Sequence, residues 1–256
     1  MLLEGRFFCA PAYQNDLPVG HELFIPGFFL AYWAIYGMDS VVRDYKSKFF
    51  ELALRKGNLR FGSFTLKSGR VSPYFFNAGG FDDGASLGEL ARCYADAITD
   101  SAIEFDMLFG PAYKGIPLAA ATAIAFNEYQ GRNIPYAYNR KEAKDHGEGG
   151  TILGAPLEGN VLVIDDVISA GTSVRESFQI IGQAGAAVAG VAIALDRQER
   201  GTGKLSAAQQ VKMEYEIPCT AIASLDDLIR YLEMQSISDI DLDAIQDYRE
   251  RYGTKI

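Results

Sequence analysis

The segment VLVIDDVISAGTS, residues 161–173, decides the fold of this 256-residue chain. Its first four residues are all apolar, which is typical of a strand buried on both faces of a parallel sheet. Two carboxylates, Asp165 and Asp166, follow the strand directly, and a turn of small residues then opens a predicted helix at 172–184. The backbone N–H groups of such a turn, with the helix dipole behind them, form a site for an anion.

The same segment offers two different chemistries to one ligand. Its hydroxyl groups, on Ser169, Thr172 and Ser173, add donors for a phosphate, whereas the two adjacent carboxylates suit sugar hydroxyls or a cation carried by the ligand. A phosphate at one end and a diol at the other describe a ribose 5-phosphate. The alternative is an ordinary strand–turn–helix unit with capping hydroxyls and solvated acids. No Gly-Lys-Ser/Thr follows, so the segment does not match a Walker loop.

The rest of the chain alternates short apolar strands with amphipathic helices. The predicted strands span 59–66, 71–77, 105–109, 134–138, 161–164, 188–195 and 219–223. The predicted helices span 39–56, 84–99, 116–129, 172–184, 225–235 and 239–251. The first two strands are joined by four residues, which indicates a hairpin. Later strands without polar alternation, separated by helices, predict an α/β fold with a mainly parallel sheet covered on both faces.

Ligands of an open parallel sheet bind beyond the carboxyl ends of its strands. The loops expected there are 110–115, 139–150, 165–173 and 196–201. In the first of these, Gly110 and Gly115 permit close backbone approach, and Lys114 supplies a positive charge. Such a loop suits one side of a diphosphate.

The 139–150 loop concentrates positive charge in a chain whose net charge is −9. Its cationic candidates are Arg140, Lys141, Lys144 and His146. Its glycine-rich end is expected to be mobile, so that the loop can close over a diphosphate and stabilise a leaving group. The alternative is a solvated loop whose charges are neutralised by its own acids, Glu142, Asp145 and Glu148.

Composition restricts the function further. The 33 acidic residues outnumber the 24 lysines and arginines, which argues against a general nucleic-acid binder. Cys9, Cys93 and Cys219 are scattered and odd in number, which indicates reduced thiols in a cytoplasmic protein. Only two histidines occur, so a histidine-rich metal site is excluded.

The N-terminal stretch contains an apolar, aromatic run at residues 23–36 that is too short to cross a bilayer. Pro26 and Gly27 interrupt it, and acidic rather than basic residues precede it, so a signal peptide is poorly supported. We expect Met38 to be the natural start, with residues 1–37 an extension outside the domain at 38–256. No membrane contact is expected.

Five segments, taken together and in order, carry a resemblance to a known family. They are residues 64–77, 109–115, 140–150, 165–173 and 195–200. From about residue 40 to its end the chain resembles the orotate phosphoribosyltransferases. The resemblance implies the type I phosphoribosyltransferase fold, with a small hood built largely from the N-terminal part. It also implies transfer of ribose 5-phosphate from phosphoribosyl pyrophosphate (PRPP) to orotate in UMP biosynthesis. Mg²⁺ and a homodimer with shared active sites are implied as well.

The resemblance assigns roles to matching positions. PRPP contacts fall on Lys67, Tyr113, Lys114, Asp165, Asp166, Val167, Ile168, Ser169, Ala170, Gly171, Thr172 and Ser173. Catalytic roles fall on Arg140, Lys141, Lys144 and His146, and orotate contacts on Phe75, Phe76, Ser169 and Arg197. No residue is expected to bind the metal directly, because Mg²⁺ would be held mainly through the diphosphate.

The chemistry of the orotate candidates agrees with these roles. Orotate is a flat anion; Arg197 offers it forked donors, and Phe75 and Phe76 offer a flat apolar wall. Neighbours on a strand face opposite sides, so one phenylalanine is expected to join the core instead. A salt bridge of Arg197 with Asp196 or Glu199 is the alternative for the arginine. Transfer to another base, and a regulator that senses PRPP without chemistry, remain open as functions.

Overall fold

The computed structural model describes residues 43–66, 68–144, 150–168, 171–201, 203–235, 237 and 240–254, apart from the side chains of 142–144 and 150. The expected N-terminal extension, residues 1–37, and the expected start at Met38 lie outside these residues.

The large sheet has six strands in the order β5-β4-β3-β6-β7-β8. Their bounds are β3 Met107–Gly110, β4 Tyr136–Lys144, β5 Gly150–Gly154, β6 Asn160–Asp165, β7 Ala187–Asp196 and β8 Cys219–Ser224. Every neighbouring pair is parallel except β4 and β5. The prediction of a mainly parallel sheet is therefore confirmed, with one antiparallel edge strand added.

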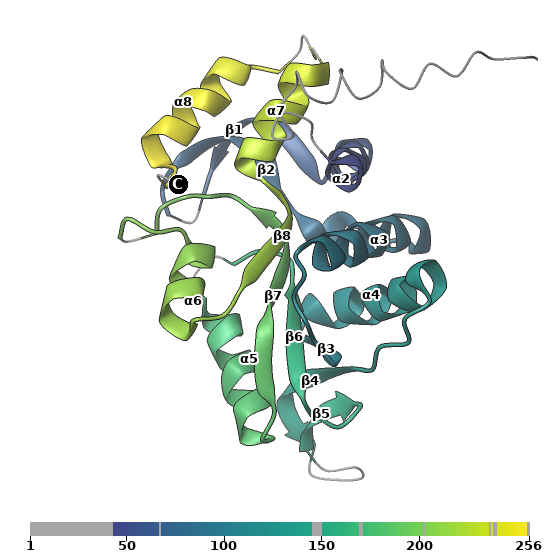
Figure 1. Cartoon of the computed structure of the whole chain (residues 1–256). Coiled ribbons are helices and arrows are strands. Elements are labelled where there is room, and N and C mark those ends of the chain that lie inside the picture. Colours follow the sequence, from purple (N-terminus) through teal and green to yellow (C-terminus); the bar gives the residue numbers. More distant parts are fainter. Residues whose placement is uncertain are drawn as a thin grey trace, which may run out of the picture. The chain divides into compact units, whose positions relative to one another are not determined.

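Helices cover both faces of this sheet (Figure 1). α3 (Gly84–Asp100) and α4 (Gly115–Gln130) lie on one face, and α5 (Thr172–Gln183) and α6 (Ala207–Tyr215) lie on the other. Alternate residues of β6 enter the two cores: Leu162 and Ile164 pack under α3 and α4, whereas Val161 and Val163 pack under α5. Burial on both sides explains why the strand is apolar without interruption.

The direction of winding reverses at the centre of the sheet. From β3 the chain passes through α4 to β4 on one side, and from β6 it passes through α5 to β7 on the other. β3 and β6 are themselves neighbours. The loops that follow these two strands therefore diverge at their carboxyl ends. The position between these two loops, called the crevice below, is where open α/β sheets bind ligands.

A hood sits over this edge. Its antiparallel hairpin consists of β1 (Leu59–Thr65) and β2 (Val71–Phe76), which form a separate two-stranded sheet. Three helices, α2 (Asp44–Arg55), α7 (Leu225–Gln235) and α8 (Leu242–Tyr252), lie around it, and a short turn, η1 (Ala78–Gly80), follows β2. The hood therefore combines the expected N-terminal part with the last two helices of the chain.

The structure differs from the predicted local structure at three places. Residues 139–144, predicted as loop, continue strand β4, and β5 returns antiparallel from Gly150; the dense charges of this stretch hide its strand character. Helix α6 was not predicted, although Ser206 and Gln209 form a capping box before it. Of the predicted helix at 39–56, residues 39–42 lie outside the described residues; Arg43 has extended backbone angles, and α2 begins at Asp44.

Candidate active site

An ion pair connects the two loops that follow β3 and β6. Lys114 Nζ lies 2.5 Å from Asp166 Oδ2. The carboxylate is buried, whereas about half of the lysine side chain remains exposed. A cation and an acid that the sequence assigns to different parts of one ligand thus meet at the point where the winding reverses.

The 110–115 loop is pressed against its neighbours, and its two glycines make this possible. A Cβ on Gly110 would collide with the Gly115 carbonyl. A Cβ on Gly115 would lie 2.5 Å from Pro111 Cδ and 2.8 Å from the Ile164 carbonyl oxygen of β6. The N–H of Ala112 donates to Asn139 Oδ1 at 2.8 Å, so β4 anchors the loop from the other side. The two glycines therefore let the loop pack tightly between β4 and β6.

Asp165 is the most strongly held residue of the site. Its Oδ2 accepts from the Ser173 hydroxyl and its Oδ1 from the Asp166 N–H, both at 2.9 Å. Its carbonyl accepts from the buried Tyr94 hydroxyl at 2.7 Å. Burial raises the pKa of the Asp165 carboxyl to about 6. No sequence pattern singles out Tyr94, because a tyrosine within a helix is typical of an ordinary core residue.

The N-terminus of α5 is open to an anion. Its N-cap, Gly171, has φ of +70°, and no side chain caps the helix. The Ser173 hydroxyl turns instead to Asp165. Unsatisfied N–H groups of the first turn favour a phosphate. Just before this turn, Val167 and Ile168 pack against the two sides of the core.

The predicted cationic segment reaches the same region through β4. Lys141 Nζ lies 5.1 Å from the centre of the Tyr113 ring, so these two site candidates are in contact. Arg140 Nη1 is buried and has no hydrogen-bond partner among the described residues. The backbone of Lys144 ends β4, but its side chain is not described. Outside the described residues lie Lys67, His146, Ser169 and Ala170.

Phe75 and Phe76 point to opposite sides of β2, as expected for strand neighbours. Phe76 packs against the core, with its ring centre 5.7 Å from that of Phe49. Phe75 instead packs beside Phe64, at 5.6 Å, and beneath the guanidinium of Arg60. The two rings therefore do not line one slot from the same side.

Arg197 follows β7 and reaches the hood. Its Nε donates to Glu199 Oε1 at 2.8 Å, and its Nη2 donates to Ser72 Oγ at 3.2 Å. Its guanidinium lies 4.3 Å from the centre of the buried Tyr74 ring. The salt bridge with Glu199 that the sequence allowed is present, but it is largely buried. Ser72 and Tyr74 carried no sequence signal for this contact.

The residues present fit a metal ion that arrives with its ligand. Among the described residues, no three His, Cys, Asp or Glu side chains gather as a metal site. Asp165 and Asp166 are adjacent, but each already has a partner, Ser173 and Lys114 respectively. Mg²⁺ commonly takes one or two carboxylates together with substrate phosphates. This donor set therefore suits a magnesium ion held mainly by a diphosphate. In the same part of the chain, no helix has the length and apolarity needed to cross a bilayer.

The fold and the crevice define a phosphoribosyltransferase. The family model described as "Phosphoribosyl transferase domain" matches residues 81–215, which include both loops of the crevice. A crystal structure of orotate phosphoribosyltransferase from Francisella tularensis is similar at a TM-score of 0.73 and 41% identity, covering 80% of this chain and 99% of that one.

Curated relatives identify the particular family. Orotate phosphoribosyltransferase from Thioalkalivibrio sulfidiphilus is 59% identical over 212 residues, and the enzyme from Pseudomonas aeruginosa is 57% identical over 212 residues. Each alignment covers 83% of this chain and 100% of the relative. The chain belongs to the orotate phosphoribosyltransferase family.

Proposed function

We infer that the protein transfers ribose 5-phosphate from PRPP to orotate, giving orotidine 5′-monophosphate and pyrophosphate. The observation that carries this inference is the contact of Lys114 with Asp166 across the crevice. This contact supports the inference because the cation proposed for the diphosphate lies next to the carboxylates proposed for the ribose, and the N-terminus of α5 follows them. The relatives named above extend the same conclusion to the base.

Different site residues bind different parts of PRPP. The first turn of α5 receives the 5-phosphate, and Asp165 and Asp166 accept hydrogen bonds from the ribose hydroxyls. The 110–115 loop and Lys114 receive the diphosphate. In the ligand-free protein Lys114 is paired with Asp166, so ligand binding redistributes this pair between diphosphate and ribose.

During the transfer, the bond between C1 of the ribose and the diphosphate oxygen breaks, and a bond from C1 to a ring nitrogen of orotate forms with inversion. The proton of that nitrogen leaves with the released pyrophosphate. The bond loosens toward an oxocarbenium-like state, as in other glycosyl transfers. When bound with the diphosphate, Mg²⁺ offsets its charge and orients it. Lys114 stabilises the charge that grows on the leaving group, and the cationic segment closes around it.

The cationic segment is tested through Lys144. A Lys144→Ala variant should lower kcat far more than it raises either KM, because the lysine acts on charge that develops in the transition state. Equal losses in all constants, or no loss, would count against this role. Arg140, Lys141 and His146 are proposed to act with it, His146 by orienting the diphosphate or supplying a proton.

The base is tested by a panel assay. Purified protein with PRPP and Mg²⁺ is given orotate, uracil, adenine or hypoxanthine, and the loss of each base is followed. Orotate should be consumed with a kcat/KM far above the others, since only it brings a carboxylate to Arg197. Preference for another base would reject orotate as the substrate. PRPP binding without consumption of any base would favour a sensor.

We also propose a homodimer. α4 is apolar on almost all sides, yet its outer face is uncovered: Ile124 is 57% exposed and Tyr129 is 56% exposed. A helix of this kind is normally buried. A second copy of the chain is the partner that the family resemblance suggests. Ile124→Lys should shift the mass in light scattering from two chains to one; a wild-type monomer at micromolar concentration would refute the dimer.

The proposal also includes a cytoplasmic enzyme whose domain begins at Met38. The free thiols of Cys93 and Cys219 accord with a reducing compartment. An intact mass measured on protein from its native cells, recovered from the soluble fraction, checks both points.

A further inference from the structure

Arg197 shares a single carboxylate with a second arginine. Glu199 Oε1 lies 2.5 Å from Arg197 Nη2 and 2.8 Å from its Nε, and Glu199 Oε2 lies 3.9 Å from Arg70 Nη1. Arg70 precedes β2 in the hood, whereas Arg197 and Glu199 follow β7 of the large sheet. Glu199 therefore stands between a cation of the sheet edge and a cation of the hood.

Three side chains hold the Arg197 guanidinium in place. Glu199 takes its Nε–Nη2 edge, Ser72 Oγ accepts a further hydrogen bond from Nη2, and the Tyr74 ring lies against its plane. These contacts use Nε, Nη2 and the ring-facing plane, so the orientation of the guanidinium is set before any ligand binds.

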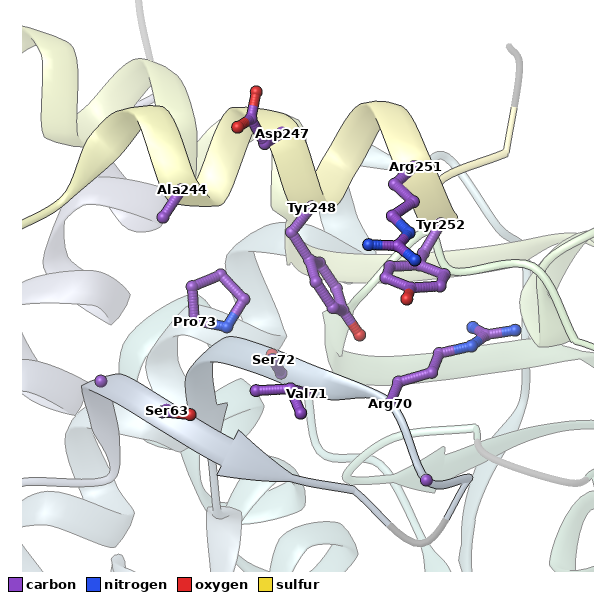
Figure 2. A pocket seen from close by; sticks show the side chains of 12 residues that line it. Ser63, Arg70, Val71, Ser72, Pro73, Ala244, Asp247, Tyr248, Arg251 and Tyr252 are labelled. Carbon is purple, nitrogen blue, oxygen red and sulfur yellow. The ribbon is translucent and has the colours of Figure 1, made fainter.

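The Tyr74 ring, which lies against the Arg197 guanidinium, is supported from α8. Tyr74 is fully buried, and its ring packs edge-on against Tyr248, with 6.3 Å between centres. A cavity of about 600 Å³ lies next to Tyr248. Figure 2 shows Tyr248 reaching from α8 toward β2 at this cavity, with Ser72 on the strand below and Asp247 on the outer side of the helix. None of the predicted site residues lines this cavity, which is bordered by Ser72 and Tyr248.

The net charge of Arg197, Arg70 and Glu199 together is one positive charge. Arg197 and Arg70 contribute two positive charges and Glu199 removes one. Orotate brings one carboxylate, so the cluster and the substrate neutralise each other. Without Glu199 the guanidinium of Arg197 would lose the charge-assisted hydrogen bonds that orient it, and two cations would face each other without their shared partner.

We propose that Glu199 is a positioning residue that orients Arg197 for the orotate carboxylate and thereby sets the affinity for the base. This inference rests on the proposed role of Arg197 in binding orotate. It predicts that a carboxylate near an anionic substrate strengthens binding, although charge repulsion alone would predict the reverse. The sign of the effect therefore tests the proposal.

The experiment compares Glu199→Gln and Glu199→Ala with the wild type in steady-state kinetics for both substrates. Loss of oriented, charge-assisted hydrogen bonds should raise KM for orotate by about tenfold in Glu199→Ala and by less in Glu199→Gln. The KM for PRPP should stay within about twofold. Asp247→Asn, which removes an acid of the same hood that does not contact Arg197, serves as the control and should leave both values unchanged.

A double-mutant cycle with Arg197→Met completes the test. If Glu199 acts through Arg197, then Glu199→Gln should have no further effect on the KM for orotate in the Arg197→Met background. Additive effects would overturn the proposal, as would a lower KM for orotate, which would show that Glu199 competes with the substrate. Parallel rises in both KM values with a lower melting temperature would show a merely structural role and also overturn it.

Failure of the underlying function has a different signature. If the wild-type protein consumes no orotate, both the proposed function and the role of Glu199 fall. If the wild type is active but Arg197→Met keeps the wild-type KM for orotate, the function stands and the role of Glu199 is overturned.

Discussion

The buried hydroxyl of Tyr94 anchors the end of β6, and its removal gives a sharp test of how the site is supported. The hydroxyl donates to the Asp165 carbonyl at 2.7 Å, and the tyrosine is fully buried in α3. Strand β3, the neighbour of β6, ends at Gly110 and leaves this part of β6 without a continuing partner on that side. A Tyr94→Phe substitution keeps the ring and removes only the donor.

The expected cost follows from the acceptor that is left behind. A buried carbonyl without a partner loses about 1–3 kcal/mol, because its interaction with water in the unfolded chain is not replaced. For a domain of this size each kcal/mol corresponds to roughly 2–4 °C in melting temperature. The variant should therefore unfold several degrees below the wild type.

The assay is urea unfolding followed by circular dichroism, with the free energy of unfolding taken from linear extrapolation. Tyr74→Phe is the matched control: Tyr74 is equally buried, but its hydroxyl has no hydrogen-bond partner within the part of the chain that the structure describes. Its removal should leave stability unchanged or increase it. Activity of Tyr94→Phe should also fall, since small displacements of Asp165 misplace the substrate.

Two results would refute the reasoning. One is a loss below about 0.5 kcal/mol in Tyr94→Phe, which is within the range of neutral substitutions. The other is an equal loss in both tyrosine variants, which would show that packing around the rings, and not the hydrogen bond, determines the change.

Three further experiments test other parts of the structure. Gly115→Ala should destabilise the protein and reduce turnover, because the added Cβ meets Pro111 and the β6 backbone. Gly88→Ala, which has open space around it, should stabilise helix α3 by up to about 1 kcal/mol in the same unfolding assay. Burial raises the pKa of Asp165 from 3.8 to about 6, so the folded protein holds a proton that the unfolded chain has released between these values. Stability relative to Asp165→Asn should therefore fall as pH rises through that window, and parallel urea series that show no such divergence would contradict it. Burial also raises the pKa of the Cys93 thiol to about 12, so peptide mapping after iodoacetamide treatment at pH 8 should find it modified only in unfolded protein.

The sequence predicts the framework of the fold because hydrophobic burial on two faces leaves a direct record. The uninterrupted apolar residues 161–164 correspond to alternating contributions to two cores. The order of loops at the carboxyl edge follows from this framework. By contrast, β5 and the second half of β4 form the edge of the sheet, where one side is solvated and charged residues mask the alternation.

The candidate site was predictable where chemistry and spacing coincide along the chain. Lys114 and Asp166 stand 52 positions apart, yet each was marked by its own loop and the fold brings them together. Tyr94 and Ser72 act through contacts with residues far away in sequence, and neither belongs to a local motif. Glu199 lies two positions from Arg197, but its second contact, to Arg70, requires the folded hood.

The central claim is that this chain moves ribose phosphate onto orotate at the crevice between β3 and β6. Its most direct test follows orotate absorbance and released pyrophosphate in one sample of purified protein with PRPP and Mg²⁺. We predict equal amounts of orotate lost and pyrophosphate formed, with both stopping when EDTA is added. Pyrophosphate release without loss of orotate, or no change in either, would contradict the claim.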